Sequence, residues 1–213
     1  MKRICTIIFT ISTVFYFAQN TLGTNLDERL FNAIKQNNFK EVKLLVEKGA
    51  DIYRKNSYGE SYLDECSYVG YIDIVKYLVE EKGFNIDQKN NDGRTPLFQA
   101  CDGGSLAVVK YLIEKGAQIN EKDIINVTPL FLSVVKGHLD ITKFLVKKGA
   151  KINIQEFRGH TPLHVAVGSE HLDIVIFLIE SGAKINIKNN YGKTPKDIAT
   201  GEIKVYLENR TVH

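Results

Sequence analysis

The histidines, cysteines and acids of this sequence are the residues that could do chemistry, and their spacing forms no catalytic pattern. The sequence has no Gly-x-Ser-x-Gly nucleophile turn, no His-Glu-x-x-His metal motif, no phosphate-binding glycine loop and no dinucleotide-binding turn. His160, Arg158 and Asp92 are the best candidates for an enzyme site, and nothing in the sequence arranges them. We therefore expect no enzyme activity, no catalytic residues, no metal site and no cofactor.

Composition and charge exclude several further classes of protein. Of the 213 residues, 44% are hydrophobic and 25% are charged, which excludes a disordered, a collagen-like or a polytopic membrane protein. The net charge of +3 is too small to argue for nucleic acid binding, because phosphates demand a basic face. Three cysteines without a Cys-x-x-Cys pair suggest neither a disulfide scaffold nor a zinc site.

The first residues have the layout of a secretory signal peptide. A short basic start (residues 1–3) precedes an uncharged apolar run over residues 4–18. This run is shorter than the roughly 20 apolar residues of a membrane-spanning helix. The small residues Thr21 and Gly23 suit cleavage after Gly23. We expect a cleaved signal peptide over residues 1–23, and the alternative is an uncleaved membrane anchor through the apolar run.

The rest of the chain repeats with a period of 33 residues. A Thr-Pro-Leu step recurs at this spacing, and a Gly-Ala pair recurs in the same register. The threonines of the first series are Thr95, Thr128, Thr161 and Thr194, the last without the leucine, and the glycines of the second are Gly116, Gly149 and Gly182. Two independent markers with one period indicate an internal repeat, and weaker copies extend it towards both ends.

Each repeat predicts a pair of short helices, best seen in the copy that begins at Thr161. The Thr161 hydroxyl can cap the first helix, and Pro162 suits the first helical position because its missing N–H costs nothing there. Apolar residues at helical spacing then define the first helix and a second one, which ends at Gly182. An extended stretch over residues 184–187 leads to the next turn. One helix pair cannot bury both of its faces, so the pairs must stack on one another.

These features resemble those of ankyrin repeats. The resemblance is carried by the Thr-Pro-Leu and Gly-Ala markers, is best seen over residues 158–183, and covers about residues 24–210. It implies an all-α fold, an ankyrin repeat solenoid of about six helix-turn-helix units with projecting turn or finger loops. We assign an N-terminal capping unit to residues 24–55, four repeats to residues 56–89, 90–122, 123–155 and 156–188, and a truncated C-terminal capping unit to residues 189–213.

Three positions depart from the repeat pattern. Ser61 replaces the capping threonine and lacks the proline after it, Asn126 replaces a turn glycine, and Glu170 replaces the glycine that ends the first helix. Asparagine tolerates the left-handed conformation, whereas a glutamate held at positive φ costs about 1 kcal/mol. In the last unit we expect a short second helix with a polar face over residues 202–207.

The histidines and cysteines have structural interpretations. The resemblance implies that His164 bonds to a neighbouring loop, and that histidines at the helix junctions fill repeat positions. His160 lies in a turn, and we expect it to have no partner that would make it a base or a ligand. Cys66 and Cys101 fall in neighbouring first helices, which lie about 8–10 Å apart and thus beyond the ~7 Å Cα separation of a disulfide. We therefore expect two free buried thiols.

The resemblance also implies where a partner protein binds. In this family the binding positions are commonly the turn tips, the residue before the capping threonine, and the solvent-side end of the first helix. The candidate partner-binding residues at these positions are Tyr58, Glu60, Tyr68, Asp92, Arg94, Asp102, Ile124, Ile125, Val135, Lys136, Phe157, Arg158, His160 and Tyr191. Tips are normally polar, so the apolar and aromatic tips favour a contact surface. The alternative is that neighbouring tips cover one another.

The sequence therefore predicts a monomeric, non-enzymatic protein that binds a partner protein through its tips and concave first-helix face. We expect no nucleic acid partner and no membrane contact beyond the N-terminal segment. The signal peptide predicts a secreted or periplasmic location, and the alternative is membrane anchoring through residues 4–18. Exported ankyrin proteins resemble those that intracellular bacteria direct at host proteins, which implies a host partner. The alternative function is a structural spacer or scaffold at the cell envelope.

Overall fold

The computed structural model describes residues 26–210, and the predicted signal peptide over residues 1–23 lies outside the described residues. The chain divides into two compact units, residues 1–54 and 55–213, which are described separately. The described part of the chain contains helices and turns but no strand, and its one isolated bridge pairs Lys55 with Ser61. The all-α prediction is confirmed.

The first unit contains a helix pair. One helix covers residues 26–35, and α2 (Phe39–Glu47) follows it. Leu30 and Ile34 from the first helix and Leu45 from α2 are fully buried. The apolar pattern at helical spacing therefore predicts both helices and the faces that they bury.

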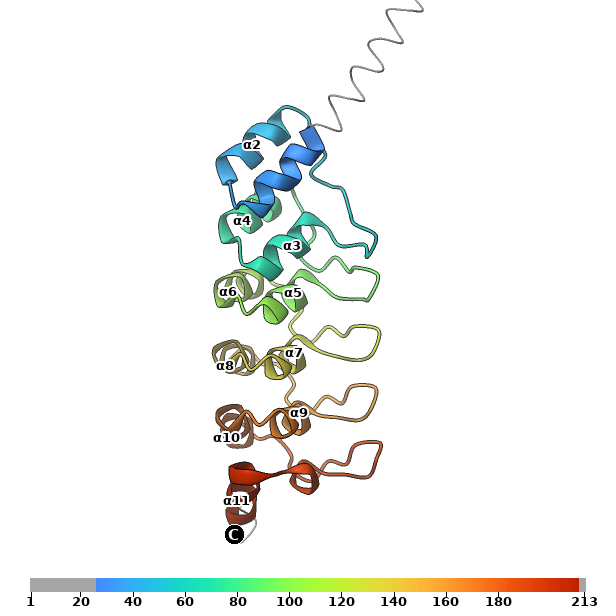
Figure 1. Ribbon diagram of the computed structural model, residues 1–213, viewed down its shortest axis with the longest axis vertical. Coiled ribbons are helices and arrows are strands. Elements are labelled where there is room, and N and C mark those ends of the chain that lie inside the picture. The colour runs from blue at the N-terminus through green and yellow to red at the C-terminus, as the bar shows by residue number, and fades with distance from the viewer. Residues whose placement is uncertain (1–25, 211–213) are drawn as a thin grey trace, which may run out of the picture. The chain divides into compact units, whose positions relative to one another are not determined.

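The second unit stacks helix pairs one after another (Figure 1). The pairs are α3 (Tyr62–Val69) with α4 (Ile72–Glu80), α5 (Pro96–Gly103) with α6 (Leu106–Glu114), α7 (Pro129–Val135) with α8 (Leu139–Lys147), and α9 (Pro162–Gly168) with α10 (Leu172–Glu180). Along the stack, each first helix contacts the next first helix and each second helix contacts the next second helix. The unit is thus a two-layered solenoid, and loops project from the side of the first helices in Figure 1.

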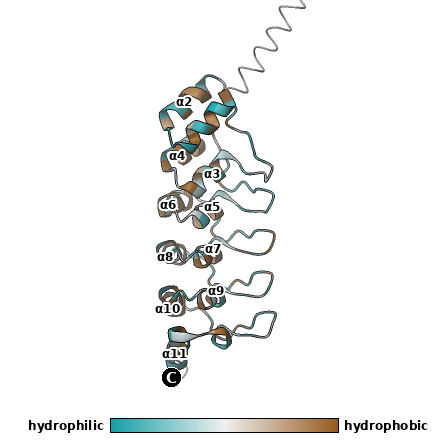
Figure 2. Ribbon diagram, in the orientation of Figure 1, coloured by the Kyte–Doolittle hydropathy of each residue, from teal (hydrophilic) through white to brown (hydrophobic). Residues whose placement is uncertain are grey.

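The core lies between the helices of the stack. The leucines of the Thr-Pro-Leu steps are buried, as Leu130 and Leu163 are, and each second helix buries a stripe such as Ile174, Val175 and Leu178 in α10. In Figure 2 the brown, apolar segments concentrate on the helices. Because burying one such side chain is worth about 1.5–3 kcal/mol, stacking is the main source of stability.

The first helices begin with the expected capping chemistry in three of four repeats. Ser61, Thr128 and Thr161 each accept a hydrogen bond from the backbone N–H three residues later. Thr95 makes no such bond, and its buried hydroxyl has no hydrogen-bond partner among the described residues. The prediction of a side-chain cap is therefore wrong for that repeat, where Pro96 still occupies the first turn of α5.

The turns adopt the left-handed conformations that the repeat requires. Asn126 has a φ of 62° and Glu170 a φ of 58°, so both replace glycine without changing the backbone. The equivalent of Glu170 in the preceding repeat is Gly137, with a φ of 73°. One detail differs from the prediction, because the stretch over residues 184–187 contains a turn at residues 185–186 and is not extended throughout.

The last unit differs from the prediction in both of its helices. Its first helix is reduced to a 3-10 turn, η1 (Lys196–Ile198), since Lys196 stands where the other repeats bury a leucine. Its second helix, α11 (Gly201–Arg210), is longer than expected and buries Ile203 and Leu207. The exact bounds of the six predicted units stay a prediction.

Candidate partner-binding surface

Five loops that we call fingers precede the first helices, and one polar side chain anchors each of them. The fingers are residues 55–60, 89–94, 122–127, 155–160 and 188–193, and their anchors are Asn56, Asn90, Asp123, Glu156 and Asn189. One side-chain oxygen of each anchor accepts hydrogen bonds of 2.9–3.0 Å from the backbone N–H groups two and four residues later. The anchor's own N–H donates to the carbonyl four residues later, which closes the finger into a hydrogen-bonded loop.

Main-chain hydrogen bonds also join each finger to the next one. The N–H of Asn91 donates to the carbonyl of Tyr58 at 3.0 Å. The equivalent bonds run from Ile124 to Asp92, from Phe157 to Ile125 and from Asn190 to Arg158, each at 3.0 Å. This ladder fixes the spacing and orientation of the fingers, so their surface is preformed and binding would cost little ordering entropy.

Large apolar and aromatic side chains project from four of the five finger tips. We call this set the tip row, and its members with their exposed fractions are Tyr58 (67%), Ile124 (69%), Ile125 (37%), Phe157 (49%) and Tyr191 (68%). Neighbouring tips therefore leave much of each side chain open to solvent. The remaining tip, in the finger over residues 89–94, carries the exposed acid Asp92.

Two charged candidates in the fingers are engaged inside the array. Glu60 accepts a hydrogen bond of 2.9 Å from the side chain of Gln99. Arg94 Nε donates to the buried carboxylate of Asp123 at 3.2 Å, across to the next finger. Both side chains therefore form hydrogen bonds between neighbouring repeats, whether or not they also contact a partner.

The other candidates lie at or just after the C-terminal ends of the first helices. Tyr68 and Val135 are exposed at the ends of α3 and α7. Lys136 Nζ lies 2.8 Å from Asp102 Oδ1, and this bond raises the pKa of Lys136. The helix ends therefore offer exposed apolar side chains and an ion pair between repeats.

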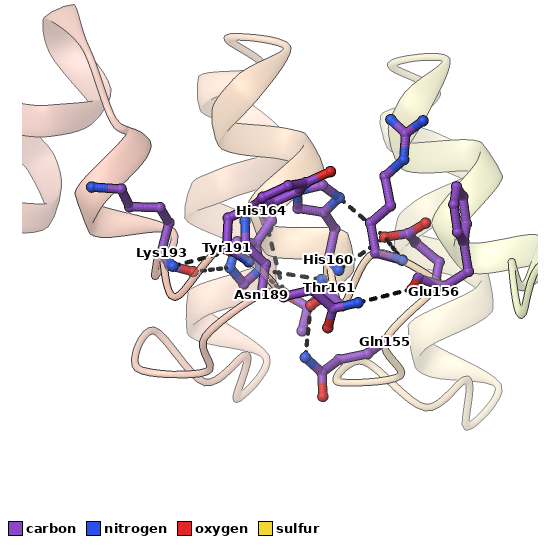
Figure 3. A network of polar contacts seen from close by, with 12 residues as sticks. Gln155, Glu156, His160, Thr161, His164, Asn189, Tyr191 and Lys193 are labelled. Atoms are coloured by element: carbon purple, nitrogen blue, oxygen red, sulfur yellow. Dashed lines mark hydrogen bonds and ion pairs between the residues drawn. The ribbon is translucent and has the colours of Figure 1, made fainter.

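His160 has a partner, contrary to the prediction from sequence. Its Nδ1 lies 3.0 Å from Glu156 Oε1, the oxygen that also anchors the finger (Figure 3). The His160 ring centroid is 5.7 Å from that of His164 and 6.2 Å from that of Tyr191. The finger turn brings the carboxylate four residues earlier back to the His160 ring, a contact that the position of His160 in a turn does not reveal by itself.

His164 links two repeats, as the resemblance implies, and its hydrogen bonds define its tautomer. The N–H of Thr161 donates to Nδ1 at 3.2 Å, so Nδ1 must be unprotonated. Nε2 then carries the proton and donates to the carbonyl of Lys193 at 3.0 Å (Figure 3). Burial lowers the pKa of His164 below its ordinary value, which favours the neutral ring that these two hydrogen bonds require.

The remaining chemistry of the described residues is structural. Cys66 and Cys101 are free and buried, as predicted, and burial raises the pKa of both thiols and makes them poor nucleophiles. No group of three or more His, Cys, Asp or Glu side chains within residues 26–210 could hold a metal ion. The helices of that same range include none that is long and apolar enough to cross a membrane.

A comparison with protein families identifies this architecture. The model described as ankyrin repeats (3 copies) matches overlapping segments over residues 12–90, 30–123, 82–156, 122–189 and 154–205. The chain belongs to the ankyrin repeat family. No curated protein in a second comparison matches it. Ankyrin repeats indicate a protein–protein interaction module, and the family is generally non-enzymatic.

The anchors of this ankyrin array, which hold the fingers in place, were not predicted from the sequence, where their positions mark only the starts of repeats. The signal was present, because the same position of every finger holds an amide or a carboxylate, in the order Asn56, Asn90, Asp123, Glu156 and Asn189. A side-chain oxygen at a fixed place before a turn is typical of a loop that is held by its own backbone N–H groups.

Proposed function

We propose that this ankyrin array binds a partner protein through the tip row and the exposed ends of its first helices. The exposure of the tip row supports this proposal most directly, since turn tips on a protein surface are normally polar. Large apolar and aromatic side chains that solvent can reach are typical of interaction sites. The hydrogen-bonded fingers keep these side chains in place before a partner arrives.

A variant that truncates four of the five tip-row side chains and keeps Ile125, which we call the tip variant, tests this proposal. It carries Tyr58→Ser, Ile124→Ser, Phe157→Ser and Tyr191→Ser, and the control is Val205→Ser, an apolar residue of α11 that is 58% exposed. Proteins captured from lysates by the unaltered chain and by the control, but not by the tip variant, support the proposal. Equal recovery by all three chains contradicts it.

A stability measurement completes this test. Exposed side chains away from special contacts change stability by roughly 0.5 kcal/mol or less each. The four substitutions of the tip variant should therefore lose at most about 2 kcal/mol together, whereas a single core substitution such as Leu163→Ala should lose about 2–5 kcal/mol. If the tip variant loses as much stability per substitution as the core variant, the tip side chains pack within the stack.

We also propose that the protein is exported through residues 1–23 and acts as a monomer on a host protein. The basic start and the apolar run of that segment support export. Mass spectrometry of secreted, periplasmic and membrane fractions tests the proposal, which expects a mature N-terminus at Thr24 in a secreted or periplasmic fraction. An intact Met1 in the membrane fraction would favour the anchored spacer instead. Light scattering of the purified chain tests the monomer.

A further inference from the structure

The fingers carry more basic than acidic residues. Their acids are Glu60, Asp92, Asp123 and Glu156, and their basic residues are Lys55, Lys89, Arg94, Lys122, Arg158, Lys188 and Lys193. The whole chain carries a net charge of only +3, so composition alone does not reveal this excess. What a partner meets depends on which of these charges remain exposed and unpaired.

Three of the four acids of the fingers are at least half-buried and hydrogen-bonded within the fold. Asp123 and Glu156 are buried anchors whose carboxylates accept backbone N–H groups. Glu60 is half-buried and accepts a hydrogen bond from Gln99. Asp92 is thus the one acid of the five fingers that is exposed.

Five of the seven basic side chains of the fingers form no ion pair within the described residues. Arg94 is paired with Asp123, and Lys89 Nζ lies 2.6 Å from Glu121. The other five are exposed and form no ion pair within the described residues, and they are Lys55, Lys122, Arg158, Lys188 and Lys193. Arg158 lies over the ring of Phe157, 4.9 Å from its centroid. Lys188 and Lys193 also attract the exposed carboxylate of Asp197 without contacting it as an ion pair. A partner at the tip row therefore meets unpaired positive charge between apolar side chains.

We propose, on the basis of the proposed function above, that the partner presents an acidic polypeptide segment with apolar or aromatic side chains. Its carboxylates would face the unpaired lysines, and its apolar side chains would contact the tip row. Stacked helices lie about 8–10 Å apart, so an extended segment would meet a new finger about every three residues.

Two features favour a polypeptide over other polyanions. The aromatic tips could stack on bases, but the aliphatic Ile124 and Ile125 give no stacking surface and suit the apolar side chains of a polypeptide instead. Asp92 lies in the same row of tips, where a uniformly anionic membrane surface cannot avoid its repulsion, whereas a polypeptide can place a neutral or basic side chain opposite it. A segment with discrete side chains can place each group opposite its complement.

Peptide selection tests this inference without knowledge of the natural partner. A display library of random 15-residue peptides is selected on the full chain, and the bound peptides are sequenced and synthesised. We expect them to be net acidic and to contain large apolar or aromatic residues. Their dissociation constants should rise several-fold when salt is raised, because exposed ion pairs are screened.

Two charge-reversal variants provide the matched comparison. The finger variant is Lys55→Glu, Lys122→Glu, Lys188→Glu and Lys193→Glu. The control variant reverses four exposed lysines of the second helices, namely Lys76→Glu, Lys110→Glu, Lys143→Glu and Lys147→Glu. Both variants change the net charge equally. The finger variant should weaken binding of the selected peptides by about tenfold or more, and the control by less than about twofold.

Three results would overturn the inference. Selected peptides that are neutral or basic, but still need the tip row, would refute the acidic partner and leave the proposed function intact. Failure to select any peptide that prefers the unaltered chain over the tip variant would contradict both. Binding of phosphatidylserine vesicles or single-stranded DNA that the finger variant abolishes, without any acidic peptide, would assign the surface to a membrane or to nucleic acid.

Discussion

Removal of one finger anchor should destabilise the array by a measurable amount. Asn90 is buried, and its Oδ1 accepts hydrogen bonds from the N–H groups of Asp92 and Arg94 at 3.0 and 2.9 Å. Asn90→Ala removes both bonds at once. Each lost bond costs about 0.5–1.5 kcal/mol, and more where the N–H stays buried. We therefore expect the free energy of unfolding to fall by about 1–3 kcal/mol.

The chain offers its own control for this experiment. Asn90→Asp keeps the acceptor oxygen, and Asp123 already fills the same role in the next finger. Urea denaturation followed by circular dichroism should place the aspartate variant within about 0.5 kcal/mol of the unaltered chain. Hydrogen exchange should speed up at residues 89–94 in the alanine variant alone. If the alanine variant unfolds at the same urea concentration as the unaltered chain and its finger amides remain protected, the anchors do not hold the fingers.

Three further predictions concern individual side chains of the second unit. Burial lowers the pKa of His164 below 6.5, so the unfolded chain binds a proton on this ring more readily than the folded chain does. The free energy of unfolding should therefore fall as the pH is lowered from about 7.5 to 5.5. Urea denaturation at each pH should show a smaller fall in His164→Gln, and an equal fall would refute this. Cys66 and Cys101 should react with a thiol reagent only in denaturant, and rapid labelling of the folded chain would contradict their burial. The Glu170 carboxylate accepts a hydrogen bond of 3.1 Å from Thr200, so the strain at its φ of 58° is tested in a Thr200→Ala chain that lacks this bond. Glu170→Gly should raise the stability of that chain by about 1 kcal/mol, and an unchanged melting temperature would count against strain at this turn.

The fold could be predicted because the residue types at the start of each first helix determine locally where that helix begins. Thr128 and Thr161 cap α7 and α9, and the proline after each fixes the first turn, so few tertiary contacts are needed to place them. The same local signal misleads in the last unit. Thr194 and Pro195 are present, but Lys196 cannot be buried as the leucine is, and the helix becomes a 3-10 turn. The absent side-chain cap at Thr95 is not evident from residue type.

The candidate surface was predictable in position but not in its internal bonding. Tyr58 and Tyr191 could be identified as exposed tips because the repeat fixes where turns fall. The contact between His160 and Glu156 could not, since it depends on the anchor oxygen turning into the finger. For the same reason the sequence alone counts Glu156 as one more surface acid, whereas the fold buries it. The unpaired charge of the fingers follows only once such burial is known.

Photo-crosslinking gives the most direct test of the claim that the fingers contact a partner protein. A photoreactive phenylalanine analogue replaces Tyr58, Phe157 or Tyr191 in turn, and the control chains carry it at Lys76 or Lys143 on the second helices. We predict that the three tip positions crosslink to the same partner protein and that the control positions do not. Crosslinking from the second helices with none from the tips would contradict the account.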